Sequence, residues 1–176
     1  FLQKELSSYL IDRSDFYLKQ SETKKALEML QKAHEYDQEN SIPASKIARI
    51  HLLNGDIQSS WLWASTSLSR SPDNHYALSI MAMIARKRGD YTLEEKYWRR
   101  AIEVWPENIE YHLFLARPLM DLRKWEEARK ELQFVLEKKP NLADAHMYMG
   151  GVMMNTHNWH EARYHLRKAL EIYPNH

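Results

Sequence analysis

Three stretches, AIEVWP at residues 101–106, VLEKKP at 135–140 and ALEIYP at 169–174, follow one another at intervals of 34 residues. Pro72 extends the series backwards by the same interval. Proline ends a helix, because it lacks the backbone N–H and crowds the preceding turn. A period of 20 to 50 residues is typical of repeat arrays, so the chain is predicted to consist of internal repeats.

Small residues keep the same 34-residue interval at three sets of positions. The first set is Ser14, Ala48, Ala82, Ala116 and Gly150; the second is Ala26, Ser60, Ala128 and Ala162, with Glu94 as the exception; the third is Ala33, Ser67, Ala101 and Ala169, with Val135 as the exception. Small side chains allow two helices to approach closely. Each repeat is therefore predicted to be a hairpin of two helices.

Five such hairpins fit the chain, in repeats at 7–40, 41–74, 75–108, 109–142 and 143–176. We expect the first helices near 7–20, 42–54, 75–88, 109–122 and 143–156, and the second helices near 22–35, 57–70, 91–104, 125–138 and 159–172. Turn residues such as Gly55 and Gly89 separate them. The predicted fold class is all-α, an α-solenoid of helix-turn-helix repeats in a single domain, 1–176.

The 34-residue unit, its small residues and closing prolines, and the aromatic residue that opens second helices at Tyr91, Trp125 and Trp159 resemble tetratricopeptide repeats. The resemblance covers nearly the whole chain. It implies a right-handed superhelix whose first helices line a concave groove, and a protein that binds another protein there rather than an enzyme. The first repeat departs most, because Arg13 stands where the others have an aliphatic residue or methionine.

By this resemblance, one stripe of each first helix faces the groove. The candidate binding residues on it are Ser45, Arg49, Tyr76, Met83, Arg86, Lys87, Phe114, Arg117, Met120, Met147, Tyr148 and Met154. The second and third repeats contribute basic groups with no acid among them: Lys46, Arg49, Arg86 and Lys87. One hypothesis is that this centre accepts a carboxylate while the adaptable methionines hold apolar side chains. The alternative is a solvated charged face over methionines of the hairpin core.

Composition excludes several function classes. The 25 Lys+Arg and 24 Asp+Glu leave a net charge of +1, which is not typical of a nucleic-acid-binding protein. The absence of cysteine excludes disulfides and thiolate zinc sites. No phosphate loop or nucleophile motif occurs, so we expect no catalytic residue and no cofactor. His157 and His160 lack acidic ligands at a suitable spacing beyond Glu161, so no metal site is predicted.

The uncharged run at 145–160 contains several polar residues, so this chain is not expected to insert into a membrane. Both cytoplasm and periplasm remain open as compartments. Because the chain begins with Phe1, we expect it to be a processed chain or a fragment of a longer protein.

The last repeat directs Leu166, Ala169 and Leu170 toward the place where a following repeat would pack. We expect that the parent protein continues there or that this end packs against another copy; a tolerated exposed apolar end is the alternative. Two further hypotheses for function are an assembly module of a larger, membrane-attached bacterial envelope or secretion protein, acting through its ends or convex face, and a regulatory arm of an enzyme domain outside this chain.

Pro118 lies in the middle of the first helix of the fourth repeat, where a kink is expected. The kink would either widen a pocket beside Phe114 and Arg117 or adjust the packing against Gly150 and Gly151.

Overall fold

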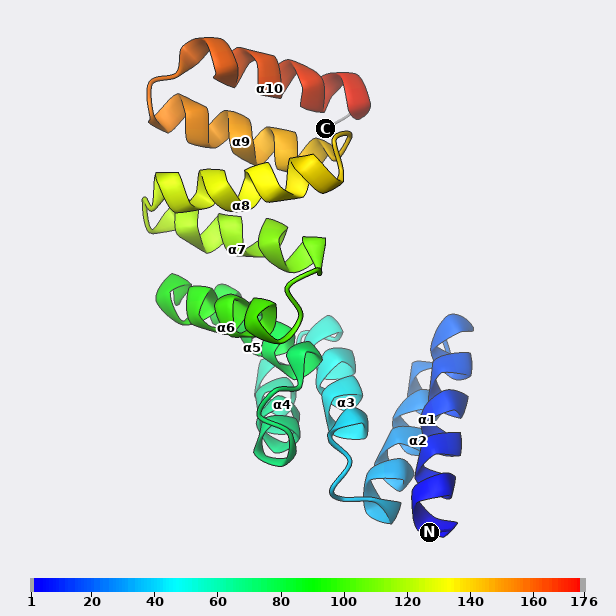
Figure 1. The fold of residues 1–176 in the computed structure, drawn as a ribbon. Coiled ribbons are helices and arrows are strands. Elements are labelled where there is room, and N and C mark those ends of the chain that lie inside the picture. The colour runs from blue at the N-terminus through cyan, green and yellow to red at the C-terminus, as the bar shows by residue number, and fades with distance from the viewer. Residues whose placement is uncertain (1, 175–176) are drawn as a thin grey trace. The chain divides into compact units, whose positions relative to one another are not determined.

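A computed structural model describes residues 2–174, and these residues form ten α-helices in adjacent pairs (Figure 1). The first helices of the pairs are α1 (Leu2–Lys19), α3 (Ser41–Leu53), α5 (His75–Lys87), α7 (Ile109–Asp121) and α9 (Ala143–Asn155). The second helices are α2 (Thr23–Tyr36), α4 (Ile57–Arg70), α6 (Tyr91–Val104), α8 (Trp125–Lys138) and α10 (Trp159–Ile172). The all-α prediction is confirmed, and the predicted helix bounds agree within one residue except at the start of α1.

Helix α1 begins at Leu2, whereas the repeat pattern predicts a start near residue 7. Residues 2–6, LQKEL, contain no helix-breaking residue, and leucine, glutamine, lysine and glutamate all have high helix propensity. Glu5 also lies in the first turn, where a negative charge is favourable beside the helix N-terminus. Local propensity therefore extends this helix beyond the repeat unit.

The chain divides into two compact units, and the division falls within α5 between Ile84 and Ala85. In the first unit α1 packs on α2 and α3 on α4, and α2 joins the two pairs through its contact with α3. One apolar core joins these helices, with Leu10 of α1, Leu30 of α2, and Ile47 and Ile50 of α3 all buried.

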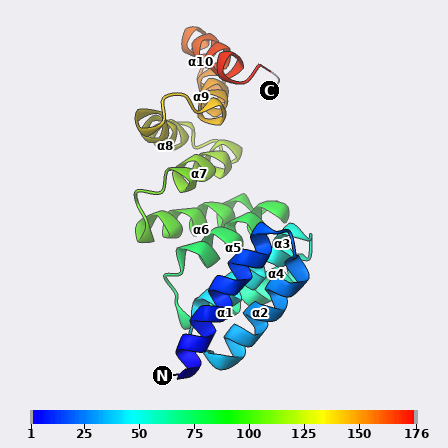
Figure 2. The ribbon, with the colours of Figure 1, turned by 90° about the vertical axis from the view of Figure 1, so that its right-hand side faces the viewer.

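The second unit continues the same pattern of packing. Its helices contact one another in the order α6, α7, α8, α9 and α10, and Figure 2 shows the pairs from the side. Trp98 of α6 is 2% exposed, and its ring lies 5.2 Å from that of Phe114 on α7. Leu115 of α7 and Leu132 of α8 are also buried. The α7–α8 pair therefore contributes apolar side chains to the core of the second unit.

The small residues occupy the buried interfaces between paired helices, as predicted. The second and third sets contain six alanines, and all six are buried: Ala26, Ala33, Ala101, Ala128, Ala162 and Ala169. Ser60 donates a hydrogen bond to the Ala48 carbonyl at 2.8 Å, so a hydroxyl in the second set also ties the paired helices together. At Gly150 an added Cβ would lie 2.7 Å from Leu166, which explains the bare backbone there.

Helix α7 continues through Pro118, which is buried, and ends at Asp121. The glycine pair of α9 approaches two different neighbours. An added Cβ on Gly151 would lie 3.1 Å from Met120 of α7, whereas Gly150 faces α10. The effect of Pro118 on binding stays a prediction.

The turn inside every hairpin contains one residue with a left-handed backbone at the same repeat position. These residues are Ser21, Gly55, Gly89, Arg123 and His157, with φ between 58° and 80°. Glycine adopts this conformation readily, whereas a residue with a Cβ is strained by about 1 kcal/mol. Three of the five repeats therefore carry a strained turn residue.

We predict that Arg123→Gly stabilises the chain by roughly 0.5–1 kcal/mol, because glycine removes the strain at an exposed position. The matched control, Gly89→Ala, should destabilise by a similar amount. Urea denaturation followed by circular dichroism measures both. A loss of stability in Arg123→Gly would show that the side chain, not the backbone, decides this turn.

Candidate functional site

The candidate binding residues lie on first helices of both units. Ser45, Arg49, Tyr76 and Met83 belong to the first unit, and Arg86, Lys87, Phe114, Arg117, Met120, Met147, Tyr148 and Met154 to the second.

In the first unit, five side chains of α1, α3 and α5 form a group that we call the Arg49 cluster: Asp15, Lys46, Arg49, Tyr76 and Met83. The Lys46 ammonium lies 2.6 Å from the Asp15 carboxylate and so links α3 to α1. The Arg49 guanidinium donates a hydrogen bond to the Met83 sulfur at 3.1 Å and so links α3 to α5. The structure therefore brings three of the predicted residues, Arg49, Tyr76 and Met83, into one neighbourhood.

Tyr76 is the aromatic member of the Arg49 cluster and is 36% exposed. Partial burial raises the pKa of its phenol, Arg49 opposes this shift, and Asp15 adds to it. The phenol is accordingly neutral near pH 7 and can donate or accept a hydrogen bond.

A cavity of about 440 Å³ lies beside this cluster, between α3 and the turn that leads into α5. Ser45, Lys46, Asn74 and Tyr76 contribute to its wall. The Asn74 amide donates to the Ser41 and Ser67 hydroxyls at 3.0 and 3.1 Å, so it serves to hold the turn. Ser45 donates to the Ile42 carbonyl at 2.9 Å and Lys46 pairs with Asp15, so among these four wall residues Tyr76 is best placed to bind a ligand.

In the second unit, Arg86 is held by carboxylates on two sides. Its guanidinium lies 3.2 Å from Glu94 and also pairs with Asp121 of α7. Burial opposes the charge of Arg86, but the two carboxylates outweigh it and raise its pKa. Burial also raises the pKa of Glu94, which Arg86 and a hydrogen bond from Trp98 only partly offset.

These ion pairs correct the expectation of a basic centre without acids. Lys46 is neutralised by Asp15 of α1, and Arg86 by Glu94 of α6 and Asp121 of α7. Among residues 2–174, no carboxylate forms an ion pair with Arg49 or Lys87. Glu94 was not predicted as a partner of Arg86. Its position nevertheless carried a signal, because Glu94 is the exception in the second set of small residues.

The apolar candidates of the second unit differ in exposure. Phe114, Met120, Met147 and Tyr148 are half-buried, whereas Met154 at the end of α9 is 45% exposed. Arg117 is half-buried, and its positive charge lowers the pKa of Glu94. The methionine stripe is therefore partly packing and partly accessible surface.

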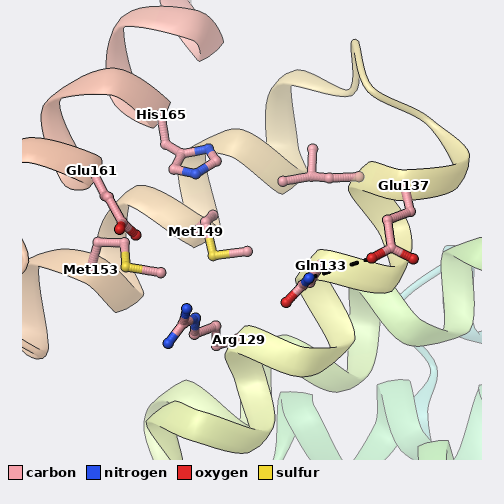
Figure 3. Close-up of a pocket in the computed structure, with 8 residues that line it drawn as sticks. Arg129, Gln133, Glu137, Met149, Met153, Glu161 and His165 are labelled. Carbon is pink, nitrogen blue, oxygen red and sulfur yellow. Dashed lines mark hydrogen bonds between the residues drawn. The ribbon is translucent and has the colours of Figure 1, made fainter.

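A second cavity, of about 370 Å³, lies between α8 and the α9–α10 pair (Figure 3). Arg129 and Gln133 of α8 face Met149 and Met153 of α9, with Glu161 and His165 of α10 beyond them. None of these residues was selected from the sequence, because they lie outside the first-helix stripe.

Two side-chain pairs that each contain a histidine occupy equivalent positions in the fourth and fifth repeats. His112 Nδ1 lies 2.6 Å from the Glu131 carboxylate, and His146 Nδ1 lies 2.8 Å from His165 Nδ1. The other ring nitrogens, Nε2 of His112 and His146, both lie 2.9 Å from proline carbonyls and donate to them. The fourth repeat thus pairs histidine with an acid, whereas the fifth pairs two histidines, which can share one proton but repel when both are charged.

The pKa values of these groups shift in opposite directions. Burial disfavours the His112 charge, but Glu131 and the Pro106 carbonyl outweigh it and raise the pKa. Burial and the neighbouring His146 lower the pKa of His165. Within the described part of the chain, no three acidic or histidine side chains gather in a way that could hold a metal ion.

None of the helices between residues 2 and 174 is both long enough and apolar enough to cross a membrane.

Comparisons with known proteins agree with this architecture. Residues 143–176 match the family model of the tetratricopeptide repeat. PilF of Pseudomonas aeruginosa superposes with a TM-score of 0.84 at 16% identity, over 97% of this chain and 78% of that one. This is the tetratricopeptide-repeat fold. The resemblance drawn from the 34-residue period is thereby confirmed.

Two further solved structures share the tetratricopeptide-repeat fold. YrrB, described as a TPR protein with an unusual peptide-binding site, has a TM-score of 0.79 at 21% identity, over 95% of this chain and 86% of that one. MamA from Desulfovibrio magneticus RS-1 has a TM-score of 0.81 at 16% identity, over 94% of each chain. Comparison with curated protein sequences gives no match.

The His112–Glu131 pair and the His146–His165 pair predict opposite responses of stability to pH. The raised pKa of His112 gives stability that is present below the unfolded value of about 6.5 and is lost as the pH rises through the folded pKa. The lowered pKa of His165 gives stability that is present above about 6.5 and is lost as the pH falls toward the folded pKa.

Exchanging the partners tests this. His165→Glu should give His146 a carboxylate partner, and as the pH falls from about 7.5 to 5.5 it should gain about 1 kcal/mol of unfolding free energy relative to the wild type, as expected for a partly exposed ion pair. Glu131→His is the reciprocal variant and should lose a similar amount over the same range. Urea denaturation at the two pH values measures both effects. The same pH dependence in all three proteins would contradict the assignment.

Proposed function

We propose that the chain is a non-catalytic protein-interaction scaffold and that the Arg49 cluster binds a carboxylate carried by a peptide segment of another protein. The observation that carries the proposal is the state of Arg49. It is half-buried, it contacts the Met83 sulfur, and no described carboxylate pairs with it. A guanidinium has five N–H donors, so donors remain for a ligand.

The surroundings of Arg49 suit a carboxylate next to an apolar side chain. Arg–carboxylate hydrogen bonds are charge-assisted and often bidentate, which fixes the orientation of the ligand. The neutral Tyr76 phenol can add a hydrogen bond, and Met83 offers an unbranched, polarisable contact. Asp15 occupies Lys46, so Arg49 rather than Lys46 is the proposed anchor.

The candidate residues of the second unit are proposed to hold apolar side chains of a partner. Phe114, Met120, Met147, Tyr148 and Met154 provide the accessible surface, with Arg117 and Lys87 as polar neighbours. Arg86 is proposed as a positioning residue only, because Glu94 and Asp121 already engage it. The peptide-binding site described for YrrB, which has the same fold, adds support to a peptide ligand.

Two other roles use different features of the molecule. An assembly role would draw on the apolar side chains exposed on α1 and α10 rather than on the Arg49 cluster. A regulatory arm of an enzyme would use the same groove residues as the scaffold, but toward a domain outside this chain.

Selection of random heptapeptides with free C-termini, followed by fluorescence anisotropy, tests the proposal. Selected peptides should carry an acidic group beside an apolar residue and bind with a Kd on the order of 1 µM, as expected for short flexible segments. Arg49→Glu should weaken binding by roughly 10- to 100-fold, the equivalent of one charge-assisted hydrogen bond.

The matched control is Arg88→Glu, which reverses an exposed charge in the turn after α5 and should leave affinity unchanged. Peptides that bind Arg49→Glu as tightly as the wild type, or a selection with no acidic preference, would refute the role of Arg49.

A further inference from the structure

The outer side of the α9–α10 pair carries an apolar groove. Met154, Trp159, Leu166 and Leu170 contribute to a cavity of about 470 Å³ there. Trp159 is 61% and Leu170 55% exposed. Large apolar side chains gathered in one open groove are typical of a protein-protein contact.

The preceding repeats show what occupies the equivalent position. Leu30 and Ala33 correspond to Leu166 and Ala169 by the 34-residue interval, and both are fully buried. They share one core with Ile47 of the following first helix, α3. The apolar groove on α10 is therefore suited to pack against the first helix of another hairpin.

Helix α1 presents the matching face of a first helix. Tyr9, Arg13 and Phe16 occupy the positions that Pro43, Ile47 and Ile50 have in α3. These three α3 residues are buried, and Ile47 and Ile50 share a core with the first repeat, whereas Tyr9 is 57% and Phe16 49% exposed. With Leu2 and Leu6 they form a continuous stripe at helical spacing, which we call the α1 stripe.

One ion pair that joins neighbouring repeats has a counterpart of opposite charges on these two faces. The Lys124 ammonium, directly before α8, pairs with the Glu95 carboxylate of α6 at 2.8 Å. The corresponding residues are Glu22, which precedes α2 and also pairs with Lys25 of the same turn at 2.6 Å, and Arg163 of α10. Both charges are reversed, so the attraction is kept.

A second position also favours this contact, and a third opposes it. Met149 and Glu137 line one cavity between neighbouring repeats, and their counterparts are Arg13 and Glu171. The counterparts of Glu127 and Arg99 are Lys25 and Arg167, which are alike in charge. Arg167 lines the groove, but both side chains are exposed to solvent, where salt screens their repulsion.

We propose that this chain associates head to tail with a second copy of itself, the α1 stripe of one copy packing into the α9–α10 groove of the other. The contact is separate from the Arg49 cluster and does not depend on the proposed peptide binding. Because the two faces differ, each association leaves one face of each kind free, and assembly continues with concentration unless a ring closes.

Sedimentation velocity with two blocked variants tests the proposal. One variant carries Tyr9→Glu and Phe16→Glu, and the other carries Met154→Glu and Leu170→Glu; all four side chains are at least 45% exposed, so the hairpins should still fold. The wild type should grow in mass between about 1 µM and 0.5 mM, the range expected for a contact of moderate affinity. Each blocked variant alone should remain monomeric, and circular dichroism checks that it is folded.

Mixing the two blocked variants gives the decisive readout. Each retains one intact face, so the mixture should form a 1:1 dimer and nothing larger. Leu53→Glu with Leu62→Glu is the matched control, since these side chains are 71% and 58% exposed but lie outside both faces; it should associate as the wild type does.

A charge exchange tests the orientation. Glu22→Arg should weaken association by about tenfold, and adding Arg163→Glu should restore it, as expected when a close charge pair is re-formed. A wild type that stays monomeric throughout, blocked variants that associate like the wild type, or a mixture that does not recombine would each overturn the proposal.

Discussion

The packing of each helical hairpin on the next is the constraint on which the rest of this structure depends. A hairpin of two helices cannot bury its apolar faces alone, so the core forms only when neighbours stack. The small residues within each pair make this stacking regular. Ala26, Ala33 and Ala128 are fully buried, and Gly150 leaves room for Leu166 where even a methyl group would collide.

This regularity explains why the fold could be predicted from the sequence. Prolines, small residues and turn residues all recur at one interval, and each acts within its own hairpin. The fold could therefore be predicted without knowledge of contacts between residues far apart in the sequence. The start of α1 was the exception, because the period carries no information about residues that precede the first repeat, and local propensity decides there.

The candidate site could be predicted less completely, since its electrostatics depend on contacts between repeats. The pairs of Lys46 with Asp15 and of Arg86 with Asp121 join residues 31 and 35 positions apart, and whether such side chains meet depends on their rotamers and not on a period. The burial of Glu94 and its need for a partner could have been predicted from the sequence. A glutamate at a position otherwise occupied by small residues must be buried, and a buried carboxylate needs a partner such as Arg86.

The position of Arg49 shows where the repeat leaves chemistry free to vary. The residues at its interval are Asp15, Arg49, Met83, Arg117 and Gly151, which share neither size nor charge. The positions one residue earlier, Ser14, Ala48, Ala82, Ala116 and Gly150, are all small and buried, because the paired helix lies against them. Neighbouring residues of one helix are thus under different constraints. Packing against the paired helix restricts the earlier position to small residues, whereas the later position can hold a larger side chain, such as Arg49, which contacts Met83. The side chains along this stripe can therefore change without disturbing the stack.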